Sequence, residues 1–109
     1  MEHDFEIAAL SFVRSMKETE TYKNYAYQLA KLRERPEKLQ QVNEFRRKNF
    51  EIKKKNQVDE LFDKMNAFET EYEKFREDPL VDDFLRAELA FCRMMQEVDI
   101  YIVQELDFE

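Results

Sequence analysis

The sequence contains no glycine, and its two prolines, Pro36 and Pro79, are the strongest interruptions along the chain. Tight β-hairpins usually need glycine or Asn-Gly at the turn, so a chain without glycine is poorly suited to an antiparallel sheet. Charged residues make up 39% of the chain and hydrophobic residues 43%, which favours amphipathic helices and argues against disorder. We therefore predict an all-α fold, an antiparallel helical bundle of about five helices, with residues 1–109 forming a single helical domain.

Prolines and capping residues divide the chain into the expected helices. These cover about residues 5–17, 22–34, 36–55, 58–77 and 79–103, with breaks near Thr19, Pro36, Asn56 and Asp78 and with Asp4 capping the first helix. The first two helices form either a tight hairpin or one kinked rod, and we favour the break. A continuous rod from Pro36 to Glu77 is the alternative for the third and fourth helices. The acidic tail after Val103 is expected to fray.

The long C-terminal helix is the element around which we expect the others to pack. Its apolar residues recur at spacings of three and four, at Leu80, Val81, Phe84, Leu85, Phe91, Met94, Met95, Val98 and Ile102. Further apolar residues lie off this stripe, which predicts burial by more than one neighbouring helix. A second, coiled-coil-like seam is predicted in the preceding helix, at Val58, Leu61, Met65, Phe68, Tyr72 and Phe75.

Charge and cysteine content indicate where such a protein works. The formal net charge of −7 disfavours general binding to nucleic acid or to an anionic membrane. No apolar run approaches the roughly 20 residues of a membrane span, and the acidic N-terminus lacks the basic region of a signal peptide. The single cysteine, Cys92, is compatible with a reducing compartment, so we expect a cytoplasmic protein.

One short segment reverses the overall charge. The candidate basic patch within residues 46–55 consists of Arg46, Arg47, Lys48, Lys53, Lys54 and Lys55, against the single acid Glu51. Such a patch could contact RNA phosphates or steer an acidic partner towards the protein. The commoner explanation is a solvated helix face paired with the protein's own acids, and we do not expect nucleic acid as the main partner.

The C-terminal helix also supplies the candidate interface. Its long apolar row, together with the 58–75 seam, exceeds what one small bundle can readily cover, which predicts a homodimer or pairing with a related chain. The candidate contacts are Phe84, Glu88, Phe91, Met95 and Val98. Glu88 is the charged member of this row. It either makes a specificity contact across the interface, with an Arg or Tyr of the partner, or lies at the edge with its carboxylate in water.

No residue pattern in the sequence indicates catalysis. His3, the only histidine, lies between Glu2 and Asp4 without further ligands at a suitable spacing for a metal. Cys92, between Phe91 and Arg93, is predicted to be a small buried and unreactive side chain. Paired acids such as Asp82-Asp83 lack a convergent His, Lys or glycine-rich loop. We therefore expect no enzyme activity, no metal and no cofactor.

Several short segments, taken in order, resemble the YlbF/YmcA family of small helical bacterial regulators. Glu20-Thr21-Tyr22-Lys23-Asn24-Tyr25 resembles that family's Ser-Glu-x-Tyr-x-x-Tyr region without the serine, and Arg35-Pro36-Glu37 stands where the family commonly has Asp-Pro-Glu. Asn43-Glu44-Phe45, Asp78-Pro79-Leu80-Val81, Phe84-Leu85 and Ala87-Glu88 follow in the family's order. The resemblance extends from about Ala8 to Ile102.

The resemblance implies a function as well as a fold. Members of this family are all-helical, tend to dimerise and regulate competence, sporulation and biofilm formation without catalysing a reaction. Some act in a multiprotein complex that carries iron–sulfur clusters and influences RNA processing through ribonuclease Y. The cluster-bound members carry several cysteines, whereas this chain has one. The resemblance therefore implies a non-catalytic regulatory or adaptor protein acting by helical protein–protein contacts, with an RNA-associated accessory protein as the alternative.

Overall fold

The computed structural model describes residues 1–55, 66–67, 69–70 and 72–107. Five helices are defined among them: α1 (His3–Lys17), α2 (Glu20–Arg33), α3 (Pro36–Lys55), α5 (Glu73–Glu77) and α6 (Pro79–Leu106). No described residue lies in a strand. The predicted all-α fold with a long C-terminal helix is confirmed.

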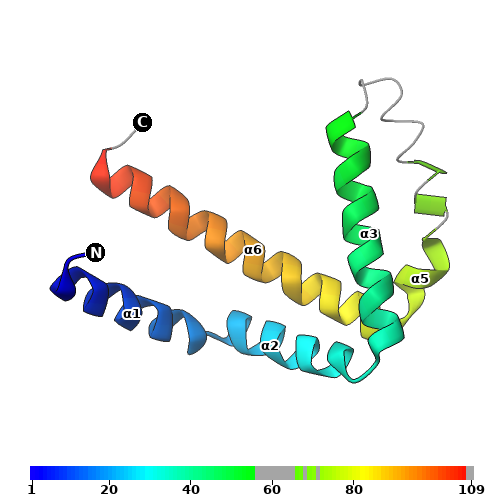
Figure 1. Cartoon of the computed structure of the whole chain (residues 1–109), viewed down its shortest axis with the longest axis horizontal. Coiled ribbons are helices and arrows are strands. Elements are labelled where there is room, and N and C mark those ends of the chain that lie inside the picture. Colours follow the sequence, from blue (N-terminus) through cyan, green and yellow to red (C-terminus); the bar gives the residue numbers. More distant parts are fainter. Residues whose placement is uncertain (56–65, 68, 71, 108–109) are drawn as a thin grey trace.

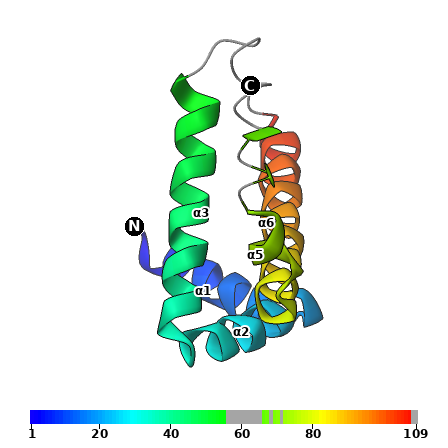
Figure 2. The same ribbon diagram turned by 90° about the vertical axis from the view of Figure 1, so that its right-hand side faces the viewer.

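Helices α1 and α2 follow one another along one arm of the molecule, and α6 runs back beside them (Figure 1). Among the described elements, α2 and α6 make the most extensive helix–helix packing. Helix α3 rises steeply from the far end of α2, next to α5, as the side view also shows (Figure 2). The N-terminus and the end of α6 therefore lie at the same end of the molecule, away from α3.

Two of the predicted breaks are made by the side chains expected to cap them. Thr19 accepts a hydrogen bond on its hydroxyl oxygen from the backbone N–H of Tyr22, 3.1 Å away. Asp78 accepts one on its carboxylate from the backbone N–H of Leu80, at 3.0 Å, with Pro79 in the first turn that follows. The predicted boundary at Pro36 is confirmed as well, because α3 begins there.

The first helix begins earlier than the sequence predicted. Helix α1 begins at His3, and Glu2 occupies the capping position without a side-chain hydrogen bond. The prediction that Asp4 caps this helix is therefore wrong. Asp4 lies inside the first turn, where its charge still interacts favourably with the positive end of the helix dipole.

Two further boundaries differ from the prediction. The backbone of Tyr72 is not helical (φ −101°, ψ 12°), so the predicted single helix over 58–77 is interrupted there. The Tyr72 ring packs edge-on against Phe45 and Phe75, with ring centroids 5.4 and 5.5 Å away. Helix α6 continues through the expected frayed tail to Leu106 and ends where Asp107 turns left-handed (φ 52°). The predicted break at Asn56 and most of the 58–75 seam lie outside the described residues.

The hydrophobic core lies at one end of the molecule, where α2, α3, α5 and α6 meet. Leu32, Val42, Val81 and Phe84 have no exposed surface. Around them pack Tyr25, Leu29, Leu39, Phe75, Leu80 and Leu85. Helix α1 contributes no buried residue. The C-terminal half of α6 is also unburied, because the buried residues of that helix end at Ala87.

The molecule is open for its size. Its radius of gyration is 17.8 Å, whereas a compact chain of this length has a radius near 13 Å. Its accessible surface is 8897 Å², against roughly 6,500 Å² for a typical monomer of this mass. The excess of roughly 2,400 Å² is surface that a compact domain of the same mass would bury.

Candidate functional site

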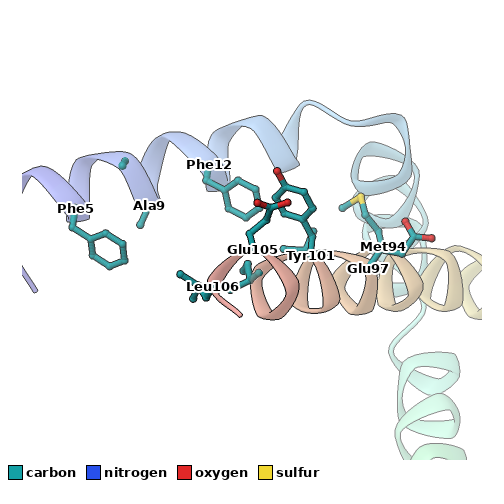
Figure 3. Close-up of a pocket in the computed structure, with 11 residues that line it drawn as sticks. Phe5, Ala9, Phe12, Met94, Glu97, Tyr101, Glu105 and Leu106 are labelled. Carbon is teal, nitrogen blue, oxygen red and sulfur yellow. The ribbon is translucent and has the colours of Figure 1, made fainter. Parts of the chain in front are cut away.

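A concave groove separates α1 from the C-terminal half of α6 (Figure 3). Its volume is about 700 Å³. The apolar lining comes from Phe5, Ala8, Ala9 and Phe12 of α1 and from Met94, Val98, Tyr101, Ile102 and Leu106 of α6. Phe5 and Phe12 point from α1 towards α6, so the groove presents hydrophobic side chains from both walls.

The groove follows from the apolar periodicity of its two walls. Spacings of three and four residues place Phe5, Ala8 and Phe12 on one side of α1, and the same spacings place Val98, Tyr101 and Ile102 on one side of α6. The small side chains Ala8 and Ala9 leave space between the walls instead of filling it. Both helices therefore direct an apolar face into a space that no described part of the chain occupies.

The groove is closed at one end by contacts between α2 and α6. The Thr19 hydroxyl lies 3.8 Å from the Met94 sulfur. One turn further, the Tyr25 ring stacks on Phe91 with centroids 5.1 Å apart, and Tyr22 meets the same ring edge-on at 5.6 Å. The other end is open to solvent, where Phe5, Tyr101 and Leu106 are 60%, 64% and 71% exposed.

The electrostatics of the groove are one-sided. Glu97 and Glu105 are the charged residues among its lining. The groove is formed by residues 2–12, which begin α1, and by residues 94–107, which end α6. Neither segment contains a Lys or Arg, and the one histidine in them is His3. Their carboxylates are Glu2, Asp4, Glu6, Glu97, Asp99, Glu105 and Asp107. The two segments that form the groove therefore carry negative charge and no positive charge, and Glu97 and Glu105 bring that charge into the lining.

The structure divides the candidate interface residues between the core and the surface. Phe84 is fully buried, with its ring centroid 6.0 Å from that of Tyr25. Phe91 is half-buried against the tyrosines of α2. Val98 lines the groove, and Met95 is exposed. Phe84 has no surface left for a partner, while Met95 and Val98 do; the dimer contact itself stays a prediction.

Glu88 is paired within its own chain. Its carboxylate accepts a hydrogen bond from the guanidinium of Arg46, which joins α6 to α3. The same guanidinium lies over the Phe84 ring, 5.3 Å from its centroid. Glu88 therefore contacts an arginine of its own chain, and the specificity contact across an interface stays a prediction.

The candidate basic patch is partly used inside the molecule. Besides the Arg46–Glu88 pair, Arg47 lies 3.3 Å from the Glu51 carboxylate one turn further along α3. The Lys48 ammonium lies over the Tyr72 ring, 5.4 Å from its centroid. The side chains of Lys53, Lys54 and Lys55 lie outside what the structure describes. The described part of the patch thus resembles a helix face paired with the protein's own groups.

Cys92 differs from its prediction. Its side chain is exposed, so the expectation that it is a small buried residue is wrong. The helical phase explains the error: Phe91 faces the tyrosines of α2, and the next residue points about 100° away around the helix. Its position in an apolar stretch of the sequence, directly after Phe91, therefore does not place Cys92 in the core.

The described residues contain no obvious chemical site. They include no group of three or more His, Cys, Asp or Glu side chains placed to hold a metal ion, and His3 is exposed at the start of α1. Among the helices of the described residues, none is both long and apolar enough to cross a membrane.

Sequence reasoning missed the groove although it identified both of its walls. Spacings of three and four residues predicted an apolar face on the first helix as well as the long apolar row of the C-terminal helix, and the uncovered part of that row was assigned to a homodimer. The available signal was the acidic composition shared by the two terminal segments, which is unusual for faces that pack against each other. What could not be read from the sequence is that α1 remains apart from α6.

Fold and site together define an all-helical protein with an uncovered apolar groove and no described catalytic group. The sequence profile of the family described as "Control of competence regulator ComK, YlbF/YmcA" matches residues 8–107. The chain belongs to the YlbF/YmcA family, which confirms the resemblance and indicates a regulatory role. Searches of curated proteins and of solved structures found no match.

Proposed function

We propose that this protein is a non-catalytic regulator of the kind that the family description names, an adaptor that acts on control of competence by helix–helix contact with another protein. The observation that carries the proposal is the uncovered groove between α1 and α6. Two exposed apolar helix faces that border one groove are a feature of protein interaction sites.

The openness of the molecule supports the same proposal. A specific protein–protein interface buries about 800 Å² on each partner. The surface of roughly 2,400 Å² in excess of a compact monomer is enough for more than one such contact. The groove supplies an apolar centre and an acidic rim, the arrangement usual for a specific interface.

The groove supports this proposal better than the basic patch supports an RNA-associated role. Arg46 and Arg47 are engaged with Glu88 and Glu51, and phosphate binding would have to compete with those pairs. The groove has no such internal competitor among the described side chains.

We also propose that the chain works in the cytoplasm and associates with a second copy or a related family member through the outer side of α6. Leu89, Cys92, Ile100 and Val103 recur at spacings that return to one side of the helix, and all four are exposed. This outer stripe is separate from the groove wall formed by Val98 and Tyr101. A second copy on the outer stripe leaves the groove free for another partner.

The adaptor function is tested by complementation in a naturally competent bacterium that lacks its own family member. Phe12→Asp and Tyr101→Asp each place a charge in the apolar groove, at sites exposed enough to leave the fold intact. Tyr27→Asp is the matched control, an aromatic residue on α2 that is 61% exposed and does not line the groove. We expect competence-gene expression to be restored by the wild-type chain and by Tyr27→Asp.

Competence-gene expression with either groove variant should be lower than with the wild-type chain by roughly tenfold or more. A charge buried at the centre of an interface costs well above about 1.4 kcal/mol of binding free energy. Circular dichroism confirms that each variant is folded. Restoration by Phe12→Asp and Tyr101→Asp to the wild-type level would refute a groove-based function.

A further inference from the structure

We propose, building on the adaptor function, that the occupant of the groove is an amphipathic helix of another protein with lysine or arginine flanking its apolar stripe. The proposal rests on three properties of the groove: its walls, its openness and the sign of its rim.

The shape of the groove suits a helix. Its two walls are helices, and the α6 wall from Met94 to Leu106 is about 18 Å long at roughly 1.5 Å per residue. That length matches about three turns of a third helix. A helix packed there would present apolar residues at i, i+3, i+4 and i+7 to both walls, as in helix-in-groove recognition.

The same openness argues against a small molecule. Sites for small ligands usually cover most of the ligand surface, and few residues there stay widely exposed. Here Phe5 and Leu106 remain more than half exposed on either side of the open end. A compact ligand would leave those side chains uncovered, whereas a helix extending beyond the groove would cover them.

The rim specifies the charge of the occupant. Glu97 and Glu105 are part of the groove wall, and residues 2–12 and 94–107, which supply its walls, carry further carboxylates and no Lys or Arg. Next to the closed end the charges are balanced, because Arg14 and Lys17 are accompanied by Glu18 and Glu20. The uncompensated negative charge therefore lies along the groove walls, and the basic residues of the occupant should lie there, towards the open end. Complementary charge of this kind selects partners and accelerates their association.

A second copy fits this groove less well. If the grooves of two copies packed against each other, the acidic side chains of one copy would face those of the other, which is unfavourable. The segment of this chain with suitable chemistry is the basic end of α3. Its insertion into another copy would be a head-to-tail contact that extends into larger assemblies instead of closing as a dimer.

The test uses two synthetic helical peptides with an identical leucine stripe, one flanked by lysine and one by glutamate, each carrying a fluorophore for anisotropy. The double variant Glu97→Lys/Glu105→Lys reverses the rim at two exposed positions. Glu34→Lys/Glu44→Lys makes the same charge change on exposed residues at the α2–α3 end of the molecule. Circular dichroism verifies the fold of all forms.

We expect the lysine peptide to bind the full chain at least about tenfold more tightly than the glutamate peptide at low salt, with the difference shrinking as salt is added. Glu97→Lys/Glu105→Lys should reverse this preference, and the control pair should keep it. Phe12→Asp should weaken binding of both peptides.

Other results overturn the inference. Equal binding of the two peptides, or a preference unchanged by Glu97→Lys/Glu105→Lys, means that the rim does not select the occupant. Concentration-dependent assemblies that are abolished by Glu97→Lys/Glu105→Lys identify a second copy as the occupant instead. If the peptides fail to bind while Phe12→Asp and Tyr101→Asp still abolish complementation, this inference fails and the adaptor function stands. Peptide binding alongside intact complementation by those variants refutes the function instead.

Discussion

At the residue scale, Asp78 does two tasks at the junction before α6. Its carboxylate accepts the capping hydrogen bond from the Leu80 N–H and forms an ion pair with the Lys38 ammonium of α3. Both side chains are about a quarter exposed, so solvent screens the pair only in part. The hydrogen bond from Lys38 is the main cause that holds the pKa of Asp78 below its ordinary value of 3.8.

Substitutions at Asp78 separate these two tasks. Asp78→Asn keeps a capping oxygen but loses the ion pair, and we expect a loss of roughly 0.5–1 kcal/mol in the free energy of unfolding. Asp78→Ala loses both, for a total of about 1–2 kcal/mol. Urea denaturation at pH 7 measures both values, and equal losses for the two variants would contradict a separate contribution from the ion pair.

The same site has a signed pH dependence. The pKa of Asp78 is lower in the folded protein than in the unfolded chain, so the unfolded chain binds the Asp78 proton more readily. The contribution of Asp78 to the free energy of unfolding therefore rises with pH. The contribution is complete above the ordinary pKa of 3.8 and is lost as the pH falls through the lowered folded value. Asp78→Asn should therefore lose less stability than the wild type on acidification from pH 5 to below pH 3. A steeper loss in Asp78→Asn would contradict this sign.

Single residues also show what the sequence can and cannot predict. The breaks near Thr19 and Asp78 were predicted correctly, because capping depends on residues two or three positions away. The pairing of Glu88 depends on Arg46, which lies 42 positions away in the sequence, so only the tertiary arrangement could identify the partner. Cys92 was misassigned for the same reason: exposure depends on which side of α6 the other helices cover.

At the scale of elements, α1 is the helix with the least tertiary support. It has no buried residue, whereas Phe84 and Leu32 hold α6 and α2 in the core. A helix of 15 residues without packing is marginal in water, because most helical stability in proteins comes from burying an apolar face. Its boundaries were nevertheless predictable to within a few residues, since they depend on local periodicity.

Amide hydrogen exchange tests this difference between elements. We expect the α1 amides to exchange at least roughly tenfold faster than those of α2 and of the first half of α6, because local opening of α1 exposes little apolar surface. Mass spectrometry of peptic fragments resolves these segments. Binding of the lysine-flanked peptide should slow exchange in α1. If the α1 amides of the protein without peptide exchanged as slowly as those of α2, α1 would have to be held by contacts that this structure does not contain.

At the scale of the whole molecule, the structure is a small core with two long arms. The sequence predicted the helices and the long apolar row of the C-terminal helix, but it also predicted an antiparallel bundle, in which the first helix would pack against the others. The core is instead confined to the end where α3 and α5 meet α2 and α6. The positions of Val42 and Val81 in that core follow from apolar periodicity, while the separation of α1 from α6 is a tertiary property that no single segment encodes.

This openness leads to the prediction of a dimer through the outer stripe of α6. Light scattering at micromolar concentration should give a mass near twice 13.4 kDa. Leu89→Asp and Ile100→Asp should each yield a folded monomer, since these side chains are 51% and 56% exposed in the single chain and a charge there would be buried only in the dimer. Phe12→Asp, in the groove, is the control that should remain dimeric.

Cys92 provides an independent readout, because it lies in the same stripe as Leu89 and is exposed in the single chain. A thiol reagent should therefore modify Cys92 slowly in the wild-type dimer and faster in the monomeric Leu89→Asp variant. Phe91→Asp does not serve this purpose, since Phe91 packs against Tyr22 and Tyr25 and its substitution would unfold the junction with α2. A wild-type protein that scatters as a monomer would refute the dimer. A dimer that survives both Leu89→Asp and Ile100→Asp, with Cys92 reacting equally fast in all forms, would place the contact on another face.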